Sequence, residues 1–131
     1  MKRPEQNLAK EISHYLQRQY PKVIFRFDLS SDQKLSIQQA ARNSALHGRW
    51  SKGSPDLTIY EKRGQYGALF LELKADGKSP YKKDGTIRKD KHLQRQDEFH
   101  QLLRERGYAA AFATGFWECK EMIDEYLRSE E

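Results

Sequence analysis

Two stretches, GSPDLTIY at residues 53–60 and GALFLELK at residues 67–74, decide how this chain folds. Each contains a run of residues that favour β-strands, and the segment that joins the two runs holds two glycines, so together they predict a β-hairpin with a long turn. Asp56 stands at the start of the first strand, where a buried carboxylate is costly unless something pairs with it. The hairpin therefore raises the question of what Asp56 faces.

The second strand of this hairpin ends in Glu72, Leu73 and Lys74. Because side chains alternate along a strand, Glu72 and Lys74 point to one face and Leu73 points to the other. If the turn closes as expected, Asp56 lies near the strand end that carries Glu72. An isolated Glu-x-Lys is most often an exposed charged pair, and an aspartate after Ser-Pro is most often a turn residue. The combination of both in one hairpin is much rarer by chance.

Two neighbouring carboxylates repel each other, and a hard divalent cation removes that conflict. Mg²⁺ prefers oxygen ligands, which Asp56, Glu72 and a nearby backbone carbonyl would supply. Lys74 would then orient or deprotonate an attacking water, or stabilise the charge that builds up on a phosphate. We therefore expect a Mg²⁺ or Mn²⁺ cofactor at this hairpin.

The rest of the chain alternates between helical and extended patterns. Apolar residues at three- and four-residue spacing predict helices, and shorter apolar or alternating runs predict strands. The helices are expected at residues 4–19, 36–46, 92–106 and 116–131, and the strands at residues 22–29, 56–60, 68–74 and 108–114. The order α-β-α-β-β-α-β-α is typical of the α/β class, with a mixed central sheet flanked by helices.

The composition describes a chain with a modest core and a heavily charged surface. The 131 residues, 37% hydrophobic and 33% charged, predict a single domain spanning residues 1–131. No apolar run approaches the ~20 residues of a membrane span, and the N-terminal residues show no secretory signal. Cys119 is the only cysteine, which rules out an internal disulfide or a cysteine-based zinc site and suggests that it packs the last helix. We expect a cytoplasmic protein with no membrane partner.

The positive charge of the chain is concentrated in one place. The formal net charge is +5, and residues 78–91 carry six basic residues against two aspartates: Lys78, Lys82, Lys83, Arg88, Lys89 and Lys91. Such a concentration suggests a polyanionic partner. A solvated loop that binds nothing fits the charge alone equally well.

Two further residue types have open roles. His14, His47, His92 and His100 show no paired metal-ligand spacing, so we expect surface or hydrogen-bonded histidines. Trp50 and Tyr81 flank basic residues, where an aromatic ring stacks on a base or sugar, packs in the core or is simply exposed.

The combined pattern resembles the PD-(D/E)-x-K superfamily of metal-dependent nucleases and is similar to its VRR-NUC branch, which includes stand-alone phage and bacterial forms. That branch has Gly-x-Pro-Asp-Leu, then a glycine-bordered strand ending in Glu-x-Lys, then a helix with the pattern Q-x-x-F-x-x-x-L-x-x-x-G-Y. The helix pattern is matched in register by Gln96, Phe99, Leu103, Gly107 and Tyr108. The resemblance covers about residues 4–112 and implies a restriction-endonuclease-like core.

The resemblance also implies roles for individual residues. Asp56, Glu72 and the backbone carbonyl of Leu73 would hold the metal, Lys74 would act on the water, and Gln96 would orient water or phosphate.

Two of the implied positions have rivals nearby. Glu5 would approach the site from the first helix, and Glu11 is a weaker candidate for that position. Gln96 is preferred to Gln94 because Phe99 and Leu103 follow it on the same helical stripe.

The activity implied is that of a metal-dependent DNA endonuclease that leaves a 5′-phosphate. No obvious major-groove reading element is present, so we expect structure-selective cutting of branched, flap or Holliday-junction DNA. The basic stretch, about residues 77–91, lies between the catalytic hairpin and the active-site helix, is long for this branch, and is our candidate for backbone contacts.

The resemblance further suggests a homodimer, no small-molecule cofactor and, if the chain is phage-encoded, action in the host cell. Two alternatives stay open. One is a non-catalytic nucleic-acid-binding module, and the other is a sequence-specific restriction-type endonuclease.

Overall fold

The computed structural model describes residues 4–28, 36–50 and 52–129, and for residues 4–6 it describes the backbone alone. The predicted order of helices and strands is confirmed, with one short 3₁₀ helix added. The elements are α1 (Pro4–Gln19), β1 (Phe25–Phe27), α2 (Ile37–His47), η2 (Gly48–Trp50), β2 (Leu57–Ile59), β3 (Leu69–Lys74), α3 (Lys91–Glu105), β4 (Ala109–Thr114) and α4 (Gly115–Arg128).

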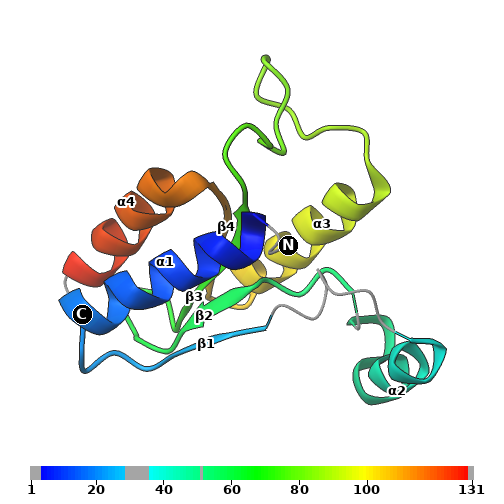
Figure 1. Ribbon diagram of the computed structural model, residues 1–131, viewed down its shortest axis with the longest axis horizontal. Helices are drawn as coiled ribbons and strands as arrows, with labels where there is room; N and C mark the ends of the chain where they lie inside the picture. The colour runs from blue at the N-terminus through cyan, green and yellow to red at the C-terminus, as the bar shows by residue number, and fades with distance from the viewer. Residues whose placement is uncertain (1–3, 29–35, 51, 130–131) are drawn as a thin grey trace.

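The four strands form one mixed sheet in the order β1-β2-β3-β4 (Figure 1). β1, β2 and β3 pair antiparallel, so the predicted hairpin is confirmed, whereas β3 and β4 pair parallel. Parallel neighbours require a long connection that returns the chain to the other end of the sheet. Residues 75–90 and α3 make that connection, which places α3 across the sheet.

The sheet lies between two helical layers. α1 and α4 run side by side on one face (Figure 1), where the core gathers around Ile12, Leu71, Leu73 and Ile123. The expected packing of Cys119 in this core is confirmed. α3 covers the other face. None of the described helices combines the length and the apolar composition that a membrane crossing requires.

β1 is shorter than the strand predicted at residues 22–29. The chain turns after α1, where the Val23 amide donates to the Tyr20 carbonyl, and regular pairing begins only at Phe25. Single hydrogen bonds continue beyond each end of β1. The Tyr60 amide donates to Ile24, and the Asp28 amide donates to the carbonyl of Asp56. β1 therefore fixes the backbone of Asp56 even though it is short.

α2 forms where the sequence predicted it, but it has no buried residue among those described. Its start is stabilised locally by a capping box, in which the Ser36 hydroxyl accepts from the Gln39 amide and the Gln39 side chain accepts from the Ser36 amide. Figure 1 shows α2 standing to one side of the sheet, joined to β2 through η2. Local capping thus stabilises this helix, whose described residues pack none of their side chains into the core.

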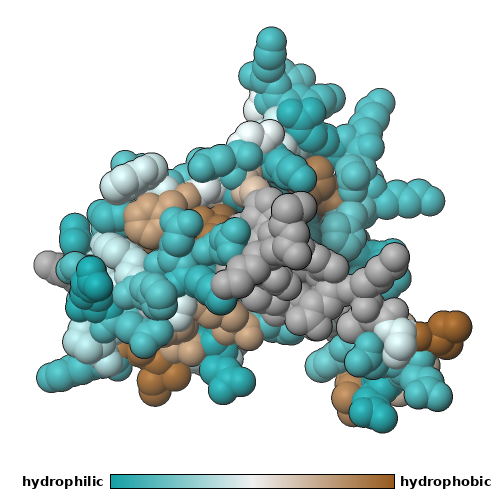
Figure 2. Space-filling model, viewed as in Figure 1, coloured by the Kyte–Doolittle hydropathy of each residue, from teal (hydrophilic) through white to brown (hydrophobic). Residues whose placement is uncertain are grey.

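The basic stretch folds as a small hairpin, which we call the basic hairpin (residues 78–91). Tyr81 and Ile87 form an antiparallel bridge, and the Lys82 amide donates to the Thr86 carbonyl at 2.8 Å. At the tip, an oxygen of Asp84 accepts from both the amide and the hydroxyl of Thr86. The hairpin makes the mostly hydrophilic projection at the top of Figure 2. The predicted loop is therefore an ordered projection with its own hydrogen bonds.

A buried carboxylate joins α1 to α4. Asp124 of α4 is 7% exposed, and one of its oxygens accepts from the hydroxyls of Tyr15 and Tyr20 while the other accepts from Lys120 at 2.8 Å. Burial raises the pKa of Asp124, but the hydrogen bonds from Lys120, Tyr15 and Tyr20 outweigh it and bring the pKa down to about 2. The ionised form of Asp124 thus stabilises the packing of the two helices.

Because the folded-state pKa of Asp124 lies below its usual value, its stabilising effect is present above pH 4 and lost as the pH falls toward 2. We expect Asp124→Asn to remove about 2 kcal/mol of unfolding free energy at neutral pH and to flatten the loss between pH 4 and pH 2. Denaturant unfolding at several pH values measures both effects. Glu125→Gln, at the exposed neighbouring position, is the control, and equal behaviour of the two variants would contradict this role.

Candidate functional site

Asp56 and Glu72 face each other across the β2–β3 hairpin. The register pairs Leu57 with Leu71, which sets Asp56, one residue before β2, opposite Glu72. Side chains at facing positions of antiparallel strands point to the same side, with Cβ atoms about 5 Å apart. Both side chains are completely buried, at 0% exposure. The hairpin therefore brings two buried carboxylates together on the face covered by α3.

The backbone around Asp56 is fixed from both sides. One carboxylate oxygen of Asp56 accepts a hydrogen bond from the Leu73 amide at 2.9 Å, and its carbonyl accepts from the Asp28 amide at 2.7 Å. A strand residue directs its N–H and C=O to the same side, so the Leu73 carbonyl also points toward the Asp56 side of β3. Asp56 is thus held in place by β1 and β3 together.

Lys74 and Gln96 meet beside the two carboxylates. The Lys74 ammonium donates to the Gln96 side-chain oxygen at 2.9 Å and lies 5.7 Å from the centre of the Phe112 ring. Because an ammonium only donates, the amide oxygen of Gln96 must face Lys74, and its NH₂ group points elsewhere. That NH₂ group is buried and has no hydrogen-bond partner among the described residues.

The position of Gln96 depends on how α3 is anchored. Asp90 caps the start of the helix, where its side chain accepts from the amides of His92 and Leu93. Gly53 has a positive φ of 87° and packs so closely that a Cβ there would lie 3.1 Å from the Arg95 side chain and 3.2 Å from its carbonyl. Glycine at this point lets the segment that leads to Asp56 touch α3 one residue before Gln96.

The buried stripe of α3 is polar, although Leu93, Phe99 and Leu103 recur along the helix. Those three are only half-buried, whereas Gln96 and His100 are the buried residues of the helix and Gln94 is exposed. The preference for Gln96 over Gln94 as the inward residue is therefore correct in geometry. Gln96 faces inward because α3 covers the sheet face that carries the charged residues.

His100 departs from the expectation of a surface or hydrogen-bonded histidine. It is completely buried, its ring lies 4.6 Å from that of Phe112, and neither nitrogen has a hydrogen-bond partner in the described part of the chain. Burial lowers its pKa to about 4, with help from the positive charges of Arg104 and Lys74. The sequence signal was its position four residues after Gln96, on the same helical face.

Of the two glutamates proposed on the first helix, only Glu11 has a described side chain. Glu5 lies in the first turn of α1, and its side chain falls outside the described part of the structure. Glu11 is exposed and lines a separate hollow with Asn7 and Asp76. This hollow shows that the N-terminal half of α1 lies beside the chain just beyond β3.

The donor set around Asp56 suits a hard cation. Carboxylate and carbonyl oxygens are the ligands that Mg²⁺ and Mn²⁺ prefer, and Asp56, Glu72 and the Leu73 carbonyl offer such oxygens on adjacent strands. Within residues 7–28, 36–50 and 52–129, no group of three or more His, Cys, Asp or Glu side chains could hold a metal. An ion here would therefore be bound by two carboxylates, backbone carbonyl oxygen and solvent or substrate oxygens.

The six basic residues proposed for nucleic-acid binding are all exposed on the basic hairpin or at its junction with α3: Lys78, Lys82, Lys83, Arg88, Lys89 and Lys91. The base of the hairpin is tied to the site through Tyr81, whose ring lies 6.0 Å from the Phe112 ring and is perpendicular to it. Phe112 also supports Lys74. The basic projection therefore begins directly beside Lys74.

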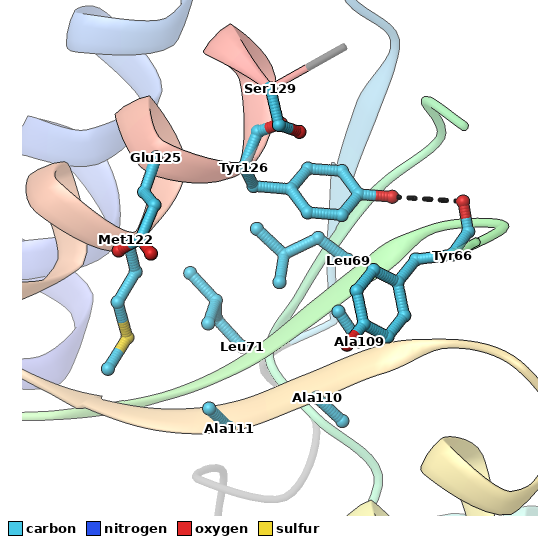
Figure 3. A pocket seen from close by; sticks show the side chains of 10 residues that line it. All are labelled: Tyr66, Leu69, Leu71, Ala109, Ala110, Ala111, Met122, Glu125, Tyr126 and Ser129. Carbon is cyan, nitrogen blue, oxygen red and sulfur yellow. Dashed lines mark hydrogen bonds between the residues drawn. The ribbon is translucent and has the colours of Figure 1, made fainter. Parts of the chain in front are cut away.

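An apolar hollow of about 390 Å³ lies on the other face of the sheet, between β4 and the end of α4. Figure 3 shows Leu69, Leu71, Met122 and Tyr126 around it, with the Tyr126 hydroxyl near the Tyr66 carbonyl at 3.5 Å. None of the proposed catalytic residues lines this hollow. It is separate from the carboxylate site in both face and position along β3.

The mixed sheet, its crossover helix and the helices on both faces define a restriction-endonuclease-like α/β fold. A solved structure described as a VRR_NUC domain protein has the same fold, with a TM-score of 0.72 and 21% identity over 100% of this chain and 93% of that one. No protein-family model matches the sequence, and no curated protein matches it. The predicted VRR-NUC resemblance is thus confirmed for the fold, and a shared fold does not by itself fix the activity.

The buried imidazole of His100 yields a stability prediction. Its folded-state pKa is depressed to about 4, so the unfolded chain takes up a proton below pH 6.5 that the folded chain does not, and stability falls as the pH drops from 6.5 to 4. We expect His100→Leu to remove a pH-dependent loss of up to about 3 kcal/mol. Thermal or denaturant unfolding across this range measures it.

His92→Leu is the matched control for that measurement, because His92 is exposed on the same helix. It should leave the pH dependence unchanged. A His100→Leu curve as steep as that of the control would show that His100 titrates normally in the folded protein.

Proposed function

We propose that this chain is a divalent-metal-dependent nuclease that hydrolyses phosphodiester bonds in DNA and leaves a 5′-phosphate. The observation that carries the proposal is the pair of completely buried carboxylates, Asp56 and Glu72, on facing strand positions with Lys74 beside them. Burying two carboxylates is strongly unfavourable without compensating positive charge. A fold shared with a VRR_NUC domain protein supports the same reading.

Asp56, Glu72 and the Leu73 carbonyl would hold Mg²⁺ or Mn²⁺. When bound, the ion supplies Lewis-acid stabilisation of phosphate charge and makes a water more acidic. The hydrogen bond from the Leu73 amide keeps one Asp56 oxygen in position, so the carboxylate keeps a single orientation. Glu5 of α1 is proposed as a further ligand or outer-sphere group.

Lys74 and Gln96 would act directly on the substrate. The Lys74 ammonium, held by Gln96 and supported by Phe112, is placed to orient the attacking water or to bind a phosphate oxygen. The Gln96 NH₂ group is a buried donor that lacks a partner among the described residues, and leaving such a donor unmet costs about 1–3 kcal/mol. A phosphate or water oxygen would satisfy it, so substrate binding relieves this cost.

DNA is the substrate proposed because of the basic hairpin. Its exposed lysines and arginine stand on a projection that begins beside Lys74, and they would contact the phosphate backbone without reading sequence. The sequence shows no obvious major-groove reading element. We therefore propose structure-selective cutting of branched, flap or junction DNA, by a homodimer that would place two sites on two strands.

The site assignment is tested by cleavage of plasmid, flap, Y-form and four-way junction DNA with Mg²⁺, Mn²⁺ or EDTA. We expect cutting with either metal and none with EDTA. Lys74→Ala should lower kcat/KM by about 10²- to 10⁴-fold, and Asp56→Asn should abolish cutting while its side-chain oxygen can still accept from Leu73. Persistent cutting by both variants would remove these residues from the site.

A pair of glutamine variants gives a matched control on α3. Gln96→Ala should lower kcat, because it removes the partner of Lys74, whereas Gln94→Ala at the exposed position should behave as the wild type. Failure of the wild-type protein to cut any of these substrates would instead favour a binding module without catalysis.

The role of the basic hairpin is tested by the salt dependence of DNA binding. Each lost phosphate contact should reduce the slope of log K against log[salt] by about one. We expect Lys82→Gln/Lys83→Gln to reduce the slope by about two relative to the wild type. The control is Lys22→Gln/Lys62→Gln, which removes two exposed lysines away from the hairpin. Equal slopes for the two double variants would mean that the hairpin does not touch DNA.

A further inference from the structure

The exposed face of α3 carries an aromatic platform formed by Trp50 and Phe99. Trp50 ends η2, and its ring meets the ring of Phe99 edge-on at 5.4 Å. The indole is nevertheless 39% exposed, and the Arg49 guanidinium lies 5.1 Å from its centre. The ring is therefore held in a defined place without being buried in the core.

A basic hollow of about 520 Å³ opens on one side of this indole. It is lined by three cations, Arg49, Lys52 and Arg95, and by a single acidic residue, Glu98. Among the described residues, none of the three cations forms an ion pair. We call this hollow the groove, and its excess of positive charge favours an anionic ligand.

A second hollow, of about 190 Å³, shares Trp50 and Phe99 with the first and is otherwise lined by Leu102, Leu103 and Arg106. Its lining is mainly apolar, so one aromatic platform separates an apolar hollow from a basic one. A flat apolar ring next to a negatively charged group is the chemistry of a nucleotide. Base stacking on aromatic residues combined with a positively charged groove is how proteins bind single strands.

This groove adjoins the carboxylate site through two contacts. The segment that follows Lys52 touches α3, because Gly53 packs against the side chain and carbonyl of Arg95. Arg95 lines the groove. The next residue, Gln96, is buried and accepts a hydrogen bond from Lys74. The groove and the site therefore lie against neighbouring residues of α3.

We propose that the groove around Trp50 binds an unpaired nucleotide stretch, with a base stacked on the indole and phosphates held by Arg49, Lys52 and Arg95. This inference rests on the proposed nuclease function and narrows its substrate to DNA with a single-stranded arm beside the cut, such as a flap or Y-form. Fully paired junctions offer no such base. The basic hairpin, which begins beside Lys74, would hold the paired arm.

Tryptophan fluorescence gives a direct test that needs no cleavage. In Trp117→Phe, a change at a 73% exposed position on α4, Trp50 is the remaining tryptophan. In EDTA, oligodeoxythymidine should quench its emission, and a blunt duplex should not. Equal quenching by both, or by neither, would overturn the proposal.

Affinity measurements in EDTA give the second arm. Trp50→Ala should weaken binding of oligodeoxythymidine and of the flap by about ten-fold or more, and Trp50→Phe should retain most of it. Trp117→Ala, the matched control, should bind as the wild type. Unchanged affinity in Trp50→Ala would overturn the proposal, and the quenching arm decides the matter if that variant does not fold.

The quenching and cleavage experiments distinguish failure of the groove from failure of the nuclease. Quenching by the single strand in a protein that never cuts DNA would keep the stacking groove and remove the nuclease. Cutting of fully paired junctions and flaps at equal rates, with no quenching, would keep the nuclease and remove the groove.

Discussion

The register between β2 and β3 is the constraint on which the site depends. Pairing Leu57 with Leu71 sets Asp56 opposite Glu72 and, at the same time, turns Leu71 and Leu73 into the core. A slip of one residue would exchange these faces, turning the acidic side chains into the apolar core and the leucines toward the polar face of α3. The large cost of that exchange holds the two buried acidic side chains next to each other. Stability of the core is therefore what maintains the arrangement of the site.

The parallel pairing of β3 and β4 has a second consequence. It obliges the chain to cross the sheet, and the crossover helix is the element that carries Gln96 and His100. The polar face of α3 therefore meets the polar face of β3, while β4 contributes Phe112 between them. Lys74, Gln96, Phe112 and His100 form one continuous cluster from three elements. Topology, more than any single contact, brings this cluster together.

Much of this arrangement could be predicted from local patterns. Alternation in LFLELK assigns Glu72 and Lys74 to one face, and glycines with flanking apolar runs define the hairpin. The inward position of Gln96 could be predicted too, from the helical stripe that it shares with Phe99 and Leu103. The burial of His100 was not predicted, and it follows from the packing of its ring against Phe112 of β4.

Other features also lay beyond local reasoning. The contact of Gly53 with Arg95 joins residues distant in sequence, and no local sequence pattern predicts it. The extent of β1 was overestimated, since the turn after α1 uses residues that look extended. The basic stretch has the composition of a loop, and its order comes from Asp84, Thr86 and the Tyr81–Ile87 bridge.

The way the basic hairpin is attached makes it a separable module. Its base is closed by the Arg88 amide bonding to the Pro80 carbonyl, and just beyond it Asp90 starts α3 with its own cap. Apart from Tyr81, whose ring packs on Phe112, the residues between these anchors take no part in the sheet or the core. Loop closure grows only slowly more costly with length, so the tip can be shortened, lengthened or exchanged without disturbing the register of β3 and β4. Changes of this kind would alter the reach and the charge of the projection while Asp56, Glu72 and Lys74 keep their positions.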